Sequence, residues 1–283
     1  MKEFKNKTAV ITGAGSGIGR GIAIKCAQEG MKVVLSDINE KNLERVKRKI
    51  QKAGGEVLTV KTDVSKYNEV ENLAQKTLEN YKLIHLLFNN AGVALPRLAW
   101  QYTLKDWDWV LGVNLWGVIY GIRVFVPIML KQEIKCHIVN TASVEGLGSK
   151  GPGGAAYRVA KHGVVALSEV LKNNFEEIGA KINVSVLCPA LVDTKIFTSE
   201  LNRPKEYQNK QVNKIDIHDR DRDVEIYRKI LTESPMISPE QVADVVFQAI
   251  RQEKFYILTH TQPIIKELIK ERLDAILRIF DEQ

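Results

Sequence analysis

The chain has 283 residues, of which 45% are hydrophobic and 27% charged, as in an ordinary globular protein with a sizeable core. Its net charge of +7 comes from lysines and arginines mixed with acidic residues, which favours a solvated surface over a nucleic-acid-binding patch. Three widely spaced cysteines without a C-x-x-C pair argue against disulfides or zinc and favour a reducing compartment. Because no uncharged apolar run is long enough to cross a bilayer and no signal segment precedes the first strand, we expect a cytoplasmic protein without stable membrane association.

Short apolar runs alternate with helical patterns along the chain. The helix after the first apolar run ends at Gly30, and the next helix begins with Asn39 as a suitable N-cap. This alternation predicts one α/β domain over residues 1–283, a Rossmann-like doubly wound parallel sheet with helices on both faces. The predicted strands are 8–12, 32–37, 56–64, 84–90, 136–143, 182–189 and 255–259.

Two segments depart from this pattern. Residues 198–235 are polar and densely charged, which predicts a lid inserted into a core of about 5–195 and 236–260. Residues 263–281 carry apolar side chains at helical spacing, so we expect an amphipathic helix. That helix packs on the body or on another subunit, or alternatively lies on a membrane surface.

A glycine-rich turn, TGAGSGIG (12–19), lies where the first strand passes into a helix. Its glycines fit T-G-x-x-x-G-x-G through Gly13, Gly17 and Gly19. Such a turn lets the backbone approach a phosphate, and the helix N-terminus offers free N–H groups to the anion. We therefore predict a dinucleotide site here, with Ser16 and Ile18 also contacting the cofactor.

Acidic and amide side chains follow the next three predicted strands. Asp37 closes the second strand, where a carboxylate binds the ribose hydroxyls of NAD and repels the 2′-phosphate of NADP. Asp63 and Val64 follow the third strand, and Asn90 in NNAG ends the fourth. Ligands gather at the carboxyl ends of parallel strands, so we predict that these residues bind NAD in preference to NADP.

Tyr157 and Lys161 in YRVAK are four residues apart, which places them on one face of a helix. The spacing alone also occurs by chance. The chain also carries five other motifs in a characteristic order: TGAGSGIG, NNAG, GVNLWG, NTAS and CPALVDT. With these motifs, the sequence resembles the short-chain dehydrogenase/reductase family, closely over residues 5–195.

The resemblance implies a role for each matching residue. Tyr157 is the general acid/base, and Lys161 lowers its pKa and binds the nicotinamide ribose. Ser143 in NTAS holds the substrate oxygen, and Asn114 in GVNLWG belongs to a helix that holds a water of the proton relay.

A second group of implied contacts follows the sixth predicted strand. Val192 and Thr194 match the segment that contacts the nicotinamide amide. Pro189–Ala190 stands where the family usually has Pro-Gly. The family also implies a homo-oligomer, either a tetramer or a dimer.

These features predict an oxidoreductase that interconverts a secondary alcohol and a ketone by hydride transfer to or from NAD(H). The alternatives are a catalytically inactive nucleotide-binding scaffold or sensor of the same fold, and a sugar-nucleotide epimerase or dehydratase of the extended branch.

Glu145 is either a substrate contact or an ordinary loop carboxylate. The five histidines show no metal-ligand spacing, so we expect no metal. Mostly apolar residues stand where the family builds its substrate pocket, which predicts a medium-sized apolar substrate such as a steroid or terpenoid. These residues are Val93, Leu95, Trp100, Leu147, Ile196 and Phe197.

Overall fold

The computed structural model describes residues 1–148, 153–209 and 232–282. A parallel sheet lies at its centre in the order β3-β2-β1-β4-β5-β6-β7. The chain moves outward from β1 to β3 and then returns to the other side of β1, so the direction reverses between β1 and β4. In open α/β sheets this reversal opens a crevice at the carboxyl ends of the strands. The strands are β1 (Thr8–Thr12), β2 (Lys32–Asp37), β3 (Val57–Lys61), β4 (Leu86–Asn89), β5 (Cys136–Thr141), β6 (Ile182–Cys188) and β7 (Tyr256–Leu258).

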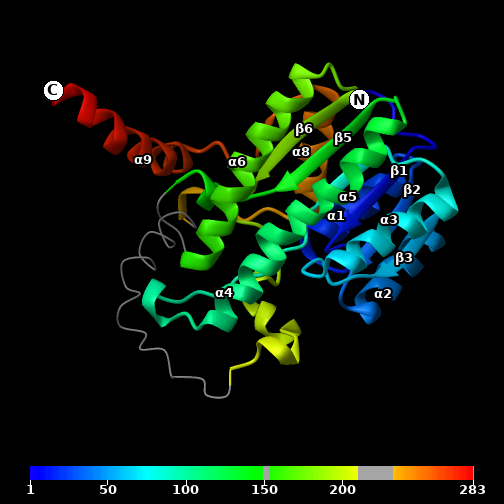
Figure 1. Cartoon of the computed structure of the whole chain (residues 1–283), viewed down its shortest axis with the longest axis horizontal. Coiled ribbons are helices and arrows are strands. Elements are labelled where there is room, and N and C mark those ends of the chain that lie inside the picture. The colour runs from blue at the N-terminus through cyan, green and yellow to red at the C-terminus, as the bar shows by residue number, and fades with distance from the viewer. Residues whose placement is uncertain (149–152, 210–231, 283) are drawn as a thin grey trace.

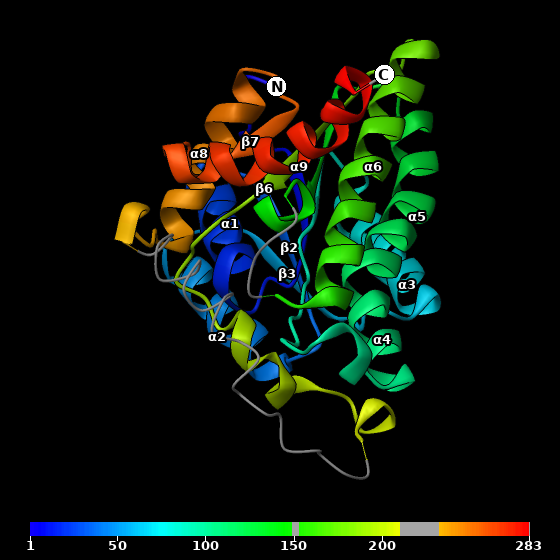
Figure 2. The same ribbon diagram turned by 90° about the vertical axis from the view of Figure 1, so that its left-hand side faces the viewer.

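Helices cover both faces of the sheet (Figures 1 and 2). Helices α1, α2 and α8 bury one apolar cluster against the strands, and α3, α5 and α6 bury another on the opposite face. The fold is therefore the predicted doubly wound α/β domain. The helices are α1 (Gly17–Gln28), α2 (Glu40–Lys52), α3 (Tyr67–Tyr81), α4 (Leu104–Leu111), α5 (Gly117–Lys131), α6 (Ala155–Glu177), α8 (Pro239–Arg251) and α9 (Pro263–Asp281).

The predicted strand positions are correct, but five of the predicted strands are too long. Observed β5, for example, ends at Thr141 rather than at residue 143, so Ser143 lies in the loop beyond the strand. Apolar composition cannot locate such an end, because the loop residues beyond the strand are also buried. The helix ends follow the local signals: the Asn39 side chain accepts a hydrogen bond from the Asn42 amide, and Gly30 has φ of +73°.

A π-helical turn, η2 (Gly112–Trp116), joins α4 to α5. It makes one continuous helical stretch, Leu104–Lys131, that is apolar and long enough to cross a membrane by length and composition alone, a test that core helices also pass. Gly121 in this stretch lies so close to Asn89 of β4 that a Cβ would meet the amide oxygen at 2.2 Å. The stretch therefore packs directly on the sheet.

A chain of buried polar side chains links β4, β5 and α6. Asn89 donates to the Asn140 amide oxygen at 2.9 Å, and Asn140 donates to the Ser168 hydroxyl at 3.0 Å. Ser168 in turn donates to the Val164 carbonyl at 2.7 Å. Buried polar groups need such partners, so these bonds set the position of α6 on the sheet.

His137 lies on β5 with only 1% of its surface exposed, and its Nε2 lies 2.8 Å from the Ser185 hydroxyl on β6. Ser185 donates onward to the Lys254 carbonyl, so the imidazole donates to Ser185. Burial, with a smaller contribution from the N-terminal ammonium, lowers the pKa of His137 to about 3. The folded protein therefore holds this histidine neutral.

We predict that His137 makes folding stability depend on pH. The unfolded histidine has a pKa near 6.5, so its contribution is complete above about pH 6.5 and is lost as the pH falls toward 3. The loss amounts to at most about 1.4 kcal/mol per pH unit. His137→Gln retains a donor for Ser185 but does not titrate. Urea unfolding between pH 7.5 and 4.5 should give a flatter stability curve for the variant, and parallel curves would contradict this origin of the pH dependence.

Candidate active site

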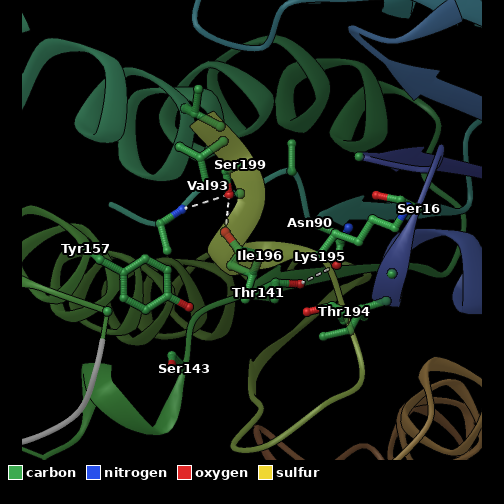
Figure 3. A pocket seen from close by; sticks show the side chains of 18 of the residues that line it. Ser16, Asn90, Val93, Thr141, Ser143, Tyr157, Thr194, Lys195, Ile196 and Ser199 are labelled. Carbon is green, nitrogen blue, oxygen red and sulfur yellow. Dashed lines mark hydrogen bonds between the residues drawn. The ribbon is translucent and has the colours of Figure 1, made fainter. Parts of the chain in front are cut away.

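One cavity of about 420 Å³ opens at the carboxyl ends of the central strands. Figure 3 shows Tyr157 and Ser143 at one side of it, and Ser16 and Thr194 at the other. The cavity lies at the reversal of strand order, where the fold places ligands. It therefore unites residues from both halves of the chain.

The loop after β1 forms the first wall. Gly13 and Gly17 have φ of +67° and +49°. Glycine adopts such positive values readily, whereas residues with a Cβ rarely do. A Cβ on Gly13 would lie 2.8 Å from the Cα of Ala91, so the loop touches the segment after β4. Gly13, Ser16, Gly17 and Ile18 line the cavity as predicted.

Gly19 differs from the prediction because it does not line the cavity in the part of the chain that the structure describes. A Cβ there would meet the carbonyl oxygen of Gly13 at 2.2 Å. Gly19 therefore allows α1 to pack closely beneath the loop. It supports the loop and does not itself face the cavity. The glycine motif in the sequence cannot separate these two roles.

Thr12 ties the end of β1 to the end of β4. Its hydroxyl donates to the Phe88 carbonyl at 3.2 Å and accepts from the amides of Asn90 and Ala91 at 2.9 and 3.1 Å. The Asn90 side chain returns a bond to the Thr12 carbonyl at 3.0 Å. Asn90 is therefore fixed in the cavity wall, and Thr12, the first residue of the TGAGSGIG motif, supports it.

Asp37 lies at the end of β2 and faces the glycine loop. Its carboxylate accepts hydrogen bonds from the amides of Gly15 and Asn39, both at 2.9 Å. Burial raises the pKa of this carboxyl, and the two amide hydrogen bonds oppose that shift. Asp63, Val64, Val192 and Thr194 also line the cavity as predicted.

Lys161 is 3% exposed, and its ammonium donates to the Thr141 carbonyl at 2.7 Å. Burial lowers its pKa to about 8. The Lys161 Nζ lies 5.5 Å from the centre of the Tyr157 ring, so the two side chains share one face of α6 as the spacing predicts.

In the protein without bound ligands, the pKa of Tyr157 lies above the usual range of a tyrosine. Burial is the main cause and the charge of Glu145 adds to it, whereas a hydrogen bond with Ser143 acts in the opposite direction. Lys161 is not among the causes of this shift, so the expected lowering of the Tyr157 pKa by Lys161 is not observed in the chain by itself. A lowered value needs a further positive charge in the cavity.

Asn114 is fully buried in the π-helical turn and does not line the cavity. Its amide donates to the carbonyls of Val93 and Val110 at 2.8 and 2.9 Å, and its oxygen accepts from the Val93 amide at 3.2 Å. A Cβ on Gly92 would lie 2.9 Å from that oxygen and 3.7 Å from the Lys161 Nζ. A side chain at Gly92, the last residue of the NNAG motif, would therefore crowd Asn114 and approach Lys161.

Apolar side chains line the substrate side of the cavity, but not all of those predicted. Val93, Ile196 and Phe197 belong to the lining, whereas Leu95 and Leu147 do not. Trp100 lies in the short helix η1 (Ala99–Gln101) and is 78% exposed. Ile265 and Leu268 at the start of α9 complete the wall, so the amphipathic helix packs on the body by its first turns. Its apolar spacing was the signal for this contact.

Residues 196–209, here called the cover segment, lie over the cavity and include η4 (Ile196–Asn202) and η5 (Lys205–Tyr207). The Ala94 amide donates to the Ser199 hydroxyl at 3.2 Å (Figure 3). Residues 210–231 of the predicted lid lie outside the described residues. The described part is thus attached to the wall beside Val93.

An ion-pair cluster anchors the cover segment to α4. Arg203 donates to the buried carboxylate of Asp106 at 2.6 Å and lies 4.9 Å from the centre of the Trp109 ring. Arg97 is 3.7 Å from the other carboxylate oxygen, which also accepts from the Thr103 amide at 2.9 Å. Burial would raise the pKa of Asp106, but these bonds and charges hold it below its usual range. The carboxylate therefore stays ionised.

Ala190 occupies the place where a glycine was expected, and it is not among the residues with positive φ. Its amide donates to the Thr259 hydroxyl at 3.2 Å. The local backbone therefore accepts alanine. Among the described residues no group of three or more His, Cys, Asp or Glu side chains is arranged to hold a metal ion.

Comparison with known proteins adds the following similarities. The short chain dehydrogenase family model matches residues 7–205. The chain is 34% identical to a CLA biosynthesis dehydrogenase/reductase of Lactiplantibacillus plantarum, over 95% of this chain and 94% of that protein. It is 28% identical to a 1-deoxy-11-beta-hydroxypentalenate dehydrogenase of Streptomyces exfoliatus, over 97% and 90% of the two chains. A crystal structure of a short chain dehydrogenase/reductase from Burkholderia phymatum in complex with NAD matches 98% of this chain and 96% of that chain, with 43% identity and a TM-score of 0.89.

We predict that Asp106→Asn destabilises the protein by about 3–5 kcal/mol, because two buried guanidinium groups lose their shared counter-charge. Urea unfolding measures the effect. Asp108→Asn on the exposed side of the same helix is the matched control and should change stability by less than about 0.5 kcal/mol. Equal stabilities of the two variants would contradict the anchoring role of Asp106.

Proposed function

Because the chain belongs to the short-chain dehydrogenase family, we propose that this oxidoreductase interconverts a secondary alcohol and its ketone with NAD(H) as hydride carrier. The observation that carries the proposal is the single cavity that joins the glycine loop and Asp37 to Ser143, Tyr157 and Lys161. A cofactor site and a proton donor in one cavity are what hydride exchange with a carbonyl requires.

The residues present fit a dinucleotide. The cavity offers a positive-φ glycine loop at the N-terminus of α1 for phosphate and the Asp37 carboxylate for ribose hydroxyls. Asp37 repels a 2′-phosphate, and this supports NAD over NADP. The oxidised cofactor supplies a hydride acceptor and a positive charge at the nicotinamide end.

In the oxidising direction, Tyr157 takes the hydroxyl proton of the alcohol at its phenolic oxygen. Ser143 orients the same substrate oxygen by a hydrogen bond, a gain that comes mainly from positioning. Lys161 supplies a fixed positive charge beneath the ring, which favours the phenolate. In the reducing direction Tyr157 returns the proton to the carbonyl oxygen.

The lining favours an apolar substrate of medium size. The cavity lining includes the apolar side chains of Val93, Ile196, Phe197, Ile265 and Leu268. The Streptomyces relative is named for a hydroxypentalenate, which is consistent with an alcohol on a hydrocarbon body. We therefore propose a steroid-like or terpenoid-like secondary alcohol, or the corresponding ketone, as the substrate class.

We further propose a cytoplasmic homo-oligomer, either a dimer or a tetramer. The three free, buried cysteines are consistent with a reducing compartment. The outer half of α9 exposes Leu273, Leu277 and Phe280 and projects from the body (Figure 1). Exposed apolar side chains in such number are typical of an interaction surface.

We predict that Tyr157→Phe lowers kcat/KM by at least about 100-fold and leaves NADH affinity unchanged, because only the proton donor is lost. A screen of secondary alcohols with NAD measures turnover, and fluorescence titration measures NADH binding. Turnover near the parental level would contradict the acid/base role. A parent protein that binds NADH but oxidises no alcohol in the screen would favour the scaffold or sensor alternative.

We predict that Asp37→Ala weakens NADH binding about tenfold and NADPH binding much less, because a hydrogen-bonded carboxylate is lost while repulsion of the 2′-phosphate disappears. Fluorescence titration with both nucleotides gives the ratio. Asp37→Asn retains an acceptor for the Gly15 amide and so separates ribose recognition from loop support. Equal weakening of both nucleotides in both variants would mean that Asp37 does not read the ribose.

A further inference from the structure

Glu145 is a buried carboxylate in the cavity wall that the proposed reaction does not use. It lies in the short helix η3 (Val144–Gly146), two residues after Ser143, and is 8% exposed. Its own amide donates to the Ser143 hydroxyl at 3.1 Å. The residue is thus attached by its backbone to the side chain that orients the substrate oxygen.

The carboxylate of Glu145 holds the backbone just before α6. Both of its oxygens lie 3.1 Å from the amide nitrogen of Gly153. Arg158, on the first turns of α6, donates from its Nε at 3.4 Å to one of these oxygens. Buried carboxylates need such donors, and these two donors belong to the segment that carries Tyr157.

Gly153 in turn lies against the Tyr157 ring. A Cβ on Gly153 would be 2.4 Å from Cδ1 of that ring and 3.0 Å from the nearer Glu145 oxygen. Carboxylate, glycine backbone and phenol ring are therefore in consecutive contact. Displacement of Gly153 would leave space beside the ring, because dense packing is what fixes a side chain in one position.

We propose that Glu145 is a positioning residue for Tyr157: it fixes the Gly153 backbone against the phenol ring and places a carboxylate directly behind that backbone. The inference rests on the proposed function, since it assigns a support to the same acid/base. Glu145 acts through the backbone and through its electric field and does not itself exchange a proton with substrate.

Several charged groups face Glu145 and Tyr157, and they define the expected field. Among the described residues, the charged groups on α6 are Arg158 and Lys161, while the Cys188 thiol at the end of β6 stays neutral because burial raises its pKa to about 12. From α9, the Arg272 guanidinium donates to the Leu147 carbonyl at 3.4 Å, next to η3.

These charges determine whether a substitution raises or lowers the pKa of the Tyr157 phenol. The negative charge of Glu145 opposes phenolate formation and the nearby cations favour it. Burial is the main cause of the raised pKa of Tyr157, and the charge of Glu145 is the next largest. Removing the charge of Glu145 while keeping its shape therefore eases ionisation, and removing Arg158 makes it harder.

The test is the pH dependence of kcat/KM for the secondary alcohol that the parent oxidises with NAD. Glu145→Gln keeps an oxygen for the Gly153 amide and should move the acidic limb to lower pH by about one unit. Arg158→Gln should move it to higher pH. Glu145→Ala, which also removes the bond to Gly153, should lower kcat at least tenfold with little change in NADH affinity.

Glu176→Gln is the control, because Glu176 is an exposed carboxylate of α6, the helix that carries Tyr157, and pairs with Lys172. Its profile should superimpose on that of the parent. Shifts of opposite sign in Glu145→Gln and Arg158→Gln, with parental NADH affinity, support the inference. Unshifted profiles in both variants of an active parent would overturn it while leaving the proposed function intact, whereas an inactive parent would overturn both.

Discussion

The hydrogen bond from the Lys161 ammonium to the Thr141 carbonyl joins the two elements on which the cavity depends. Lys161 comes from α6, and Thr141 is the last residue of β5. A buried cation is costly unless it is bonded, so this contact holds the first turns of α6 at the carboxyl end of β5, in addition to the polar chain through Ser168. Tyr157, one turn earlier, and Ser143, two residues beyond Thr141, are brought together as a result.

The architecture of the chain was largely predictable, because buried parallel strands and amphipathic helices leave clear apolar patterns. The glycine loop, Asp37 and the Tyr157–Lys161 pair were predictable for a similar reason: each needs a particular residue type at a fixed spacing. Strand ends were less accurate, since the loop around Ser143 is as buried as the strand before it.

Roles that depend on three-dimensional approach could not be predicted. Gly19 and Gly13 look equivalent in the sequence, but only Gly13 lines the cavity. The raised pKa of Tyr157 reflects its burial and the proximity of Glu145, neither of which the spacing to Lys161 reveals. Similarly, Trp100 is apolar and close in sequence to cavity residues, yet its loop turns it to solvent.

The polar chain from Asn89 through Asn140 to Ser168 has a consequence for how this sequence can diverge. Each side chain donates a hydrogen bond to the next group in the chain. Replacing one of them by an apolar residue therefore leaves a buried partner without its hydrogen bond. Replacing all three together need not carry that penalty, because the effects of residues in one network are not additive. Evolutionary change here must therefore pass through less stable intermediates, and the three positions are expected to vary as a group or not at all.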